Sequence, residues 1–339
     1  MTMLFHDTQP ALAEGALILP SEILGFSGFT GNYWYVKPGT GSDSNSGNTP
    51  STAFKTLGMA LSSATANNGD VIFLIAQSNT SASTTDYQPI TTGTQGLVWN
   101  KDGVHLIGIT DGSMIGSRAR IAQLSSVTTM TDLMTVSANG CLFANLEIYQ
   151  GVASSTATYE RALVVTGQRN RFLNCQISGM GDSSMDDAGS RSLYMSGNAT
   201  ENFFQHCYIG LDTVVRGTAT SEVELVGAAG GAKPARTIFE DCVFDTYTSA
   251  TTFKILQTTY LDRFVLLKGC TLIAAAGITS AVSPTGAIAT TTPNGRMLLQ
   301  NTAVFGCDNV TTANDAGTLV SAPAGDLVDM GLGTSVLIA

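Results

Sequence analysis

A short pattern of apolar and polar positions recurs six times along the middle of the chain. Each copy has a large apolar anchor, a polar residue or glycine two positions later, and then a position that is mostly cysteine. Successive anchors lie 28 to 35 residues apart, and a period of this length is typical of repeat architectures. The six anchors are Phe143, Phe172, Phe204, Phe239, Leu267 and Leu299.

Short apolar runs also precede the anchors, as at 133–136, 163–165 and 193–195. Such runs, separated by Gly, Asn and Ser, are typical of strands joined by tight turns. No amphipathic helix is predicted between them, and units this short bury their apolar side chains only by stacking. The pattern therefore predicts an all-β parallel β-helix, or solenoid, of about seven or more rungs spaced ~4.8 Å apart. We expect one corner per rung to carry a loop of variable length, as at 179–192 and 227–236.

The polar position after each anchor predicts a corner between two strands. Corners need a bent, often left-handed backbone, which suits Asn, Asp and Gly. We therefore expect a corner ladder that stacks from rung to rung. Its members are Asn145, Asn174, His206, Asp241, Gly269 and Asn301.

The cysteines of the repeat are interpreted as core residues. Leu146 and Thr302 occupy the same repeat position, so the site selects a buried side chain rather than a metal ligand. Stacked equivalents would lie ~4.8 Å apart, farther than a disulfide prefers. Free thiols in a core ladder are therefore predicted, while Cys141 and Cys307 fall outside the pattern. The ladder cysteines are Cys175, Cys207, Cys242 and Cys270.

An entry segment precedes the repeats. The spacing of apolar residues predicts a helix over 53–66, followed by a turn and the strand 71–75. This helix would cover the open edge of the first rung. Asp43 and Asn45 alternate as in the first half of a calcium loop, but no acidic residue stands at its twelfth position. We predict a turn capped by side chains, and no metal or other cofactor.

The repeat and the entry segment together resemble the right-handed, pectate-lyase-like parallel β-helix family, including its phage members. The right hand of the coil rests on this resemblance and on the general chirality of parallel crossovers. We divide the chain into an extended arm (1–30), an entry segment with capping helix and first rung (31–99), the β-helix (100–305), and a C-terminal cap and tail (306–339).

The arm is apolar without a clear period, and such a segment is costly in water unless it lies on another surface. We expect one or both ends of the chain to dock on a neighbouring subunit or particle. The apolar residues of the arm are Phe5, Leu17, Ile18, Leu19, Ile23, Leu24, Phe26 and Phe29.

Composition narrows the possible functions. Charged residues make up 12% of the chain, about half of the ~25% usual for soluble domains. A net charge of −10 argues against binding of nucleic acid, which requires Lys and Arg at phosphates. No apolar stretch is long enough for a membrane-spanning helix, and the first residues lack the basic region of a secretory signal.

The best candidate for chemistry is one acidic loop. Asp182, Asp186 and Asp187, followed by Arg191, could act as an acid and base or bind a cation, or could be a solvated insertion. Glu222 and Glu224 form a second possible acid pair. Three histidines give no basis for a Ser-His-Asp triad, and tyrosines that could bind sugar share no repeat position.

We therefore predict a non-enzymatic structural protein of a tailed-phage virion, specifically a capsid decoration or head-attached protein. The resemblance implies a homo-oligomer, expected to be a trimer, that binds capsid or other virion proteins. The virion, assembled in the host cytoplasm, is its expected location. The alternatives are a tailspike-like polysaccharide depolymerase or lyase that uses the acidic loop, and a receptor-binding fibre that contacts a host surface glycan.

Overall fold

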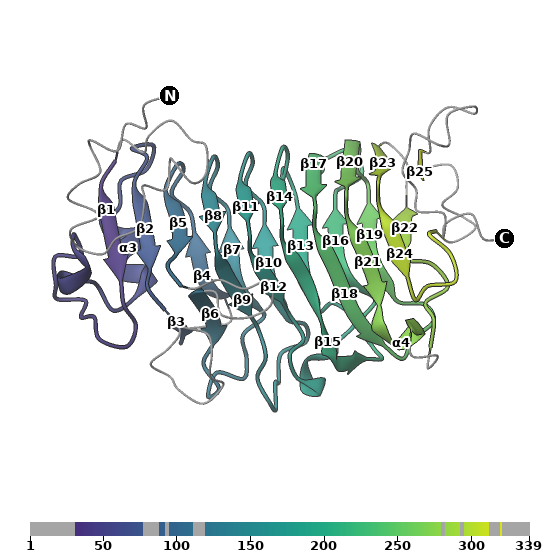
Figure 1. The fold of residues 1–339 in the computed structure, drawn as a ribbon, viewed down its shortest axis with the longest axis horizontal. Coiled ribbons are helices and arrows are strands. Elements are labelled where there is room, and N and C mark those ends of the chain that lie inside the picture. The colour runs from purple at the N-terminus through teal and green to yellow at the C-terminus, as the bar shows by residue number, and fades with distance from the viewer. Residues whose placement is uncertain are drawn as a thin grey trace, which may run out of the picture.

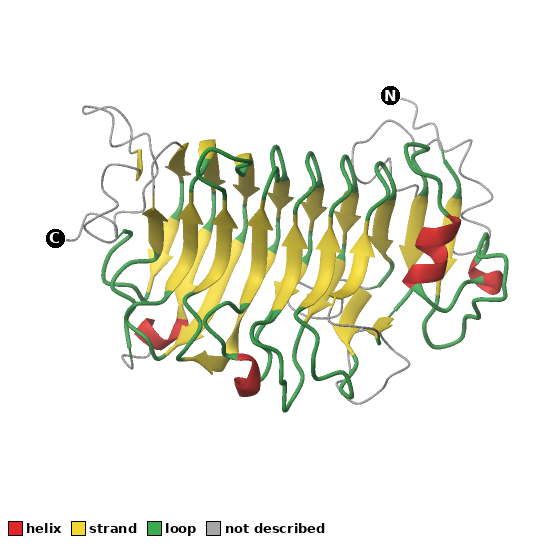
Figure 2. Cartoon of the chain, turned by 180° about the vertical axis from the view of Figure 1, so that it is seen from behind, coloured by secondary structure: helices red, strands yellow, loops and turns green. Residues whose placement is uncertain are grey.

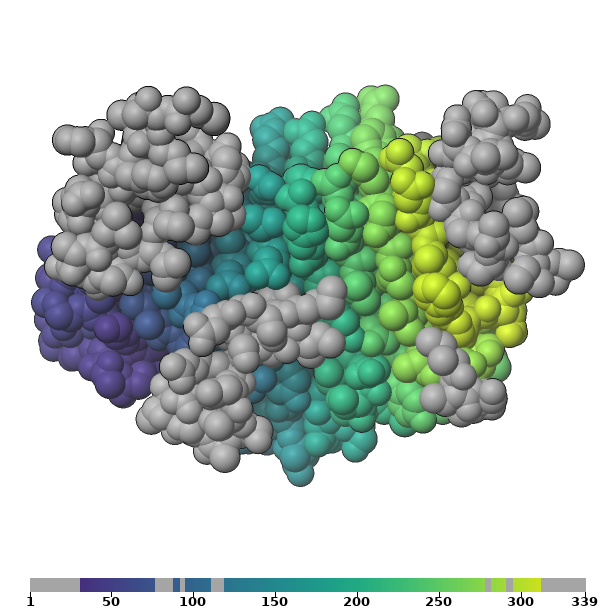
Figure 3. All heavy atoms as spheres, viewed as in Figure 1, coloured from purple at the N-terminus to yellow at the C-terminus, as the bar shows by residue number. Residues whose placement is uncertain are grey.

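The computed structural model describes residues 31–76, 88–91, 95–110, 119–278, 282–291, 295–311 and 319–320. These residues form a parallel β-helix in which each coil passes through three parallel sheets, consistent with the right-handed winding expected. Strands of successive coils lie side by side from β1 at one end of the stack to β24 near the other (Figure 1). Figure 3 shows the coils as one continuous body. Both the fold class and the stacking of units predicted from the repeat are therefore confirmed.

Sheet A carries the anchors. It comprises β1 (Tyr33–Val36), β2 (Val71–Leu74), β5 (His105–Gly108), β8 (Leu142–Ala144), β11 (Arg171–Leu173), β14 (Phe203–Gln205), β17 (Ala235–Glu240), β20 (Asp262–Lys268), β23 (Gly295–Gln300) and β25 (Leu319–Val320). Sheet B follows each anchor. It comprises β3 (Gln88–Ile90), β6 (Ala119–Gln123), β9 (Leu146–Tyr149), β12 (Gln176–Ser178), β15 (Tyr208–Arg216), β18 (Val243–Thr248), β21 (Thr271–Ala274) and β24 (Ala303–Phe305).

Sheet C contains the strands that lead into the anchors. It comprises β4 (Gln95–Trp99), β7 (Asp132–Val136), β10 (Arg161–Val165), β13 (Arg191–Ser196), β16 (Ser221–Val226), β19 (Lys254–Thr259) and β22 (Ile288–Thr291). A short helix, α4 (Ala275–Ile278), follows β21. Loop length varies at two corners rather than one: residues 179–190 connect sheet B to sheet C, whereas 227–234 connect sheet C to sheet A. The repeat could not separate these corners, because it locates a loop along the chain but not around the coil.

A stack of aromatic rings fills the centre of the β-helix. The ring of Phe172 lies parallel to those of Phe143 and Phe204, with centroids 4.9 Å and 4.5 Å away, and Phe239 stacks next at 4.8 Å. All four side chains are fully buried. In-register pairing of β8, β11, β14 and β17 places these rings above one another, since equivalent residues are direct partners.

The corner between sheets A and B has the backbone that the repeat predicted. Asn145, Asn174, His206, Asp241, Gly269 and Asn301 all have φ between 50° and 65°, the left-handed region. Asn174 Nδ2 donates to Asn145 Oδ1 at 3.1 Å, and Asn145 Nδ2 donates to the carbonyl oxygen of Gly108 at 2.9 Å. The side-chain amides thus connect one coil to the next.

The repeat cysteines bond the carbonyls of the preceding coil. The thiol of Cys207 donates to the carbonyl oxygen of Phe172, and that of Cys242 to Phe204, both at 3.5 Å. Thr302 occupies the same position, and its hydroxyl donates to the carbonyl of Leu267 at 3.1 Å. A hydroxyl thus replaces a thiol because the position offers a carbonyl acceptor inside the core. Cys175 and Cys270 make equivalent bonds, and all six cysteines are free.

Cys207 and Cys242 are expected to resist alkylation in the folded protein. Burial raises the pKa of both thiols, and the thiolate is the reactive form. Iodoacetamide at pH 8, followed by mass spectrometry, should modify these two residues only after urea is added. Equal modification rates with and without urea would contradict the buried ladder.

The entry helix is shorter than the predicted 53–66. A 3-10 turn, η2, spans Pro50–Thr52, and the α-helix α3 spans Leu57–Ser63. The helix begins late because Asp43 Oδ1 accepts the backbone N–H groups of Lys55 and Thr56, each at 2.9 Å, and Thr56 caps the first turn. Asn45 Nδ2 donates to the carbonyl of Ala53 at 2.9 Å. The two suspected metal ligands thus act as turn caps, and no metal-binding group of three His, Cys, Asp or Glu occurs among the described residues.

Helix α3 lies beside β1 and β2 at the first coil (Figure 2), and its buried residues Leu57, Ala60 and Leu61 join the interior cluster. No helix in the described ranges is long and apolar enough to cross a membrane. The apolar residues of the arm, Phe5 to Phe29, lie outside the described residues, as does most of the predicted C-terminal cap and tail.

Candidate functional site

The longer loops gather where sheet B turns into sheet C. Residues 150–160, 179–190 and 217–220 connect the strands there, and Figure 2 shows such loops along one edge of the rod. We call this edge the loop corner. It contains the acidic loop predicted as the candidate site, together with Glu222 and Glu224 on the adjoining strand β16.

Two of the predicted acids stabilise the loops themselves. Asp182 Oδ1 accepts the N–H of Ser184 at 2.9 Å and begins the short 3-10 turn η3 (Ser183–Met185). The carboxylate of Asp186 accepts three consecutive backbone N–H groups of the next coil, those of Gly217, Thr218 and Ala219, at 2.6 to 2.9 Å. The acid–base reading of this loop is not supported by such positions, because both carboxylates are already engaged by the backbone.

The predicted cation, Arg191, is also engaged by its surroundings. Its side chain is almost completely buried, and Nε donates to Glu224 Oε2 at 2.9 Å. Nη1 donates to the carbonyls of Ala188 and Ser190, and Nη2 donates to the hydroxyl of Thr220 at 2.6 Å. Arg191 therefore fixes the end of its own loop to the following coil.

A fully buried ion pair, Arg216 and Glu222, lies at the same corner. Arg216 Nε lies 3.2 Å from Glu222 Oε2, and both side chains are 0% exposed. Arg216 Nη2 donates to the carbonyl of Gly179 at 3.1 Å, and Glu222 Oε1 accepts the hydroxyl of Ser192. The pair thus joins two consecutive coils. Glu222 and Glu224 lie on one face as predicted, but each is paired with an arginine.

Glu160 is a buried acid that the sequence did not single out. Its carboxylate accepts the hydroxyl of Ser190 at 2.9 Å and that of Ser155. Burial raises its pKa, and the nearby carboxylate of Asp187, the third acid of the predicted loop, raises it further. Its position just before β10 carries no repeat signal, so only the folded loop reveals the environment.

Glu160→Gln is expected to make stability less dependent on pH. A carboxyl whose pKa is raised on folding contributes most below its unfolded pKa, and that contribution is lost as pH rises through the folded pKa. The wild-type protein should therefore lose stability relative to the variant as pH rises above about 4, the ordinary pKa of a glutamate in the unfolded chain. Urea unfolding of both proteins at a series of pH values measures the difference. Parallel curves would mean that Glu160 titrates normally.

A tyrosine and an aspartate form a second pair on the outer face of sheet B. The hydroxyl of Tyr208 donates to Asp245 Oδ2, and both residues are less than 10% exposed. Gly210, with φ of 111°, is the strand partner of Asp245, and a Cβ there would lie 1.9 Å from the carbonyl oxygen of Asp245. Asp245 Oδ1 has no hydrogen-bond partner.

Titration of this pair is shifted mainly by burial. Burial raises the pKa of Asp245, and the charges of Asp212 and Glu222 add to the shift. The pKa of Tyr208 is also raised, first by burial and then by its bond to Asp245. A carboxyl that holds its proton beyond its ordinary range can act as a general acid. This pair could not be recognised from the repeat, because Tyr208 and Asp245 occupy different repeat positions.

Tyrosines that could have formed a sugar platform pack against arginines. The guanidinium of Arg161 lies 4.5 Å from the ring centroid of Tyr159 and 4.3 Å from that of Tyr194. Arg120 lies 5.2 Å from the ring of Tyr149. These rings are therefore partly covered by cations rather than presented together as an open face.

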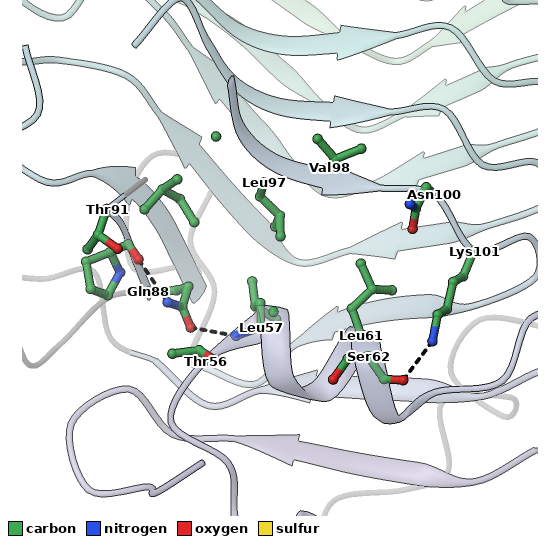
Figure 4. Close-up of a pocket in the computed structure, with 14 residues that line it drawn as sticks. Thr56, Leu57, Leu61, Ser62, Gln88, Thr91, Leu97, Val98, Asn100 and Lys101 are labelled. Carbon is green, nitrogen blue, oxygen red and sulfur yellow. Dashed lines mark hydrogen bonds between the residues drawn. The ribbon is translucent and has the colours of Figure 1, made fainter. Parts of the chain in front are cut away.

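A pocket of about 480 Å³ lies between helix α3 and strands β3 and β4 (Figure 4). Two of its polar side chains contact the helix: Gln88 Oε1 accepts the N–H of Leu57 at 3.0 Å, and Lys101 Nζ donates to the carbonyl of Ser62 at 2.8 Å. Figure 4 shows both contacts at the pocket wall. Most of the remaining lining is apolar, so the pocket offers no evident acid or base.

Solved structures with a similar chain course include polysaccharide-acting proteins. Pectate lyase Pel9A is 13% identical over 86% of this chain and 82% of its own, with a TM-score of 0.49, and a rhamnogalacturonan lyase is 13% identical over 86% and 87%, with a TM-score of 0.44. The tailspike protein gp49 of Acinetobacter baumannii bacteriophage Fri1, described as a capsular polysaccharide depolymerase, is 10% identical over 73% of this chain and 47% of its own, with a TM-score of 0.43.

The three parallel sheets define this protein as a parallel β-helix. No family model and no curated protein sequence matches the chain.

Proposed function

We propose that this chain is a non-enzymatic structural protein of a tailed-phage particle, a capsid decoration or head-attached β-helix. The phage assignment rests on the resemblance of the repeat and of the entry segment. Within the particle, the protein is expected to form a homo-oligomer, a trimer, in contact with capsid or other virion proteins.

The proposal of a non-enzymatic protein rests on the charged side chains at the loop corner, which are bonded to the backbone or to one another. Asp186 is bonded to three backbone N–H groups, and Arg191 and Arg216 are paired with Glu224 and Glu222. Catalytic acids and bases need access to substrate, whereas these groups connect adjacent coils. Charged groups in these positions are better suited to a structural role in a rigid rod than to catalysis.

Two measurements test this proposal. Mass spectrometry of purified particles should detect the protein in many copies, and electron cryomicroscopy should locate it on the head. Purified protein should release no reducing ends or unsaturated sugars from polysaccharide of the host envelope. Absence from the particles, or release of sugar products, would overturn the proposal.

A second candidate is a polysaccharide depolymerase or lyase, favoured by the Tyr208–Asp245 pair and the raised pKa of Asp245. In this function, a protonated Asp245 would give its proton to a departing sugar oxygen. Activity would then be lost in Asp245→Asn, while the matched variant Asp262→Asn, at the exposed start of β20, would remain active. A receptor-binding fibre differs from both in that it would bind host surface glycan without cleaving it.

A further inference from the structure

The outer face of sheet A is mostly apolar over its first five strands. Side chains alternate along each strand, so that Ile72 faces the core while its neighbours Val71 and Phe73 face outward. The outward residues form an apolar cluster separate from the core cluster. We call this cluster the apolar face; it consists of Tyr33, Tyr35, Val71, Phe73, Ile107, Leu142, Ala144 and Leu173.

On the later strands of the same sheet one outward column is polar, while the column beside it is apolar but only partly buried and consists of Phe203, Ile238, Leu266 and Leu298. Gln205, Glu240 and Lys268 follow Leu173 in the same column. Lys268 Nζ is paired with Glu240, and Gln205 Nε2 donates to Glu240 at 3.3 Å. A sheet face in contact with water typically carries polar residues at alternate positions, as here. Among the first five strands His105 and Arg171 occupy such positions, but the other outward side chains are apolar or aromatic, so this part of the sheet is suited to contact with another apolar surface.

The low exposed fractions of these side chains support contact with another apolar surface. Val71 is 0% exposed, Leu142 3%, and Phe73 8%, although all three point away from the core. Outward apolar residues elsewhere vary in exposure: Val98 on sheet C is 37% exposed and Phe305 on sheet B is 46% exposed, whereas Val164 on sheet C is 5% exposed. The buried side chains of α3 pack into the core cluster, not onto the apolar face. The rings of Tyr33 and Tyr35 pack on that of Phe73, and a further apolar segment lying on the cluster would complete its burial.

We propose that residues 1–30 of the same chain dock on the apolar face. The arm joins the described chain at Gly31, and the N–H of Asn32 donates to Asp70 Oδ1 at 2.7 Å, which fixes the entry point beside β1 and β2. The apolar face spans about 19 Å across its five strands, at ~4.8 Å between neighbours. Thirty residues extend up to about 100 Å, so the arm is long enough to cover it.

The arm and the apolar face are both rich in apolar residues, so each can bury the other. Because the arm is covalently joined to β1, contact with its own sheet is favoured over contact with a second copy. A segment joined directly to the edge of its binding surface has an effective concentration in the millimolar range. This inference is independent of the proposed function, since it requires neither a particle nor a substrate. It replaces the expected docking of the arm on a neighbour with docking on its own sheet.

Hydroxyl-radical footprinting tests the contact, because it reports the accessibility of aromatic side chains. In a variant that lacks residues 1–30, oxidation of Tyr35 and Phe73 should rise at least fivefold over the full chain. Oxidation of Phe204, in the core, should not change. Unchanged oxidation of Tyr35 and Phe73 would overturn the proposal.

If the truncated protein fails to fold, substitutions in the full-length chain test the same contact. Leu19→Asp with Leu24→Asp adds two charges at apolar arm positions, and should also raise oxidation of Tyr35 and Phe73. The matched control, Thr8→Asp with Ser27→Asp, adds the same charge at polar arm positions and should leave oxidation unchanged. Light scattering measures the molar mass and so distinguishes docking within one chain from docking between two copies. A full-length dimer that becomes a monomer on truncation would place the arm on a second copy and contradict docking on its own sheet.

Discussion

Arg216→Met is expected to lower the free energy of unfolding by about 3–5 kcal/mol, because removal of one member of a buried ion pair leaves an uncompensated charge. Glu222 is 0% exposed and would retain only the bond from Ser192. The carbonyl of Gly179 would lose its bond from Arg216 as well. Urea unfolding, followed by circular dichroism, measures the change.

Two further variants identify the cause of this loss. Arg216→Met combined with Glu222→Leu removes both charges and should recover much of the stability, since an apolar pair of similar volume often replaces a buried ion pair without cost. Arg169→Met breaks an exposed pair with Glu201 and should cost less than about 1 kcal/mol. A double variant no more stable than Arg216→Met would mean that the arginine acts through packing rather than charge.

Phe204→Ala is expected to be similarly costly, at about 3–5 kcal/mol, because it leaves a cavity in a filled core. The Phe204 ring stacks on both sides, 4.5 Å from Phe172 and 4.8 Å from Phe239. Its neighbours are held by strand pairing and cannot collapse into the space. Urea unfolding again gives the magnitude.

The repeat itself supplies the control substitution. Leu267 and Leu299 occupy the anchor position in later coils, so Phe204→Leu should cost less than half as much as Phe204→Ala. Phe203→Ala, one residue away on the outer face, should cost little because its side chain is only partly buried. If Phe203→Ala were as destabilising as Phe204→Ala, the inward direction assigned to the anchors would be wrong.

The backbone and the core of this protein follow from the repeat. An anchor every 28 to 35 residues requires stacked coils, and the corner positions require a left-handed backbone. The entry helix was predicted in the right place but too long, because the bonds from Asp43 to Lys55 and Thr56 delay its start. A contact between residues twelve positions apart is not visible in apolar periodicity.

The candidate site was less predictable. Asp182, Asp186 and Arg191 could be recognised as a charged loop, but their roles depend on partners 29 to 33 residues away in the next coil or on bonds within the loop. Tyr208 and Asp245 illustrate the same difficulty, since they meet only because β15 and β18 are neighbours.

The sequence by itself determined the coil, the positions that face inward, and the residues that form its corners, because these depend on a pattern repeated within each unit. Only the tertiary structure decided which charges are paired, which acids have raised pKa values, and which part of the outer surface of sheet A is apolar and buried. Those properties depend on how loops of different length meet across coils, and loop length follows no repeat.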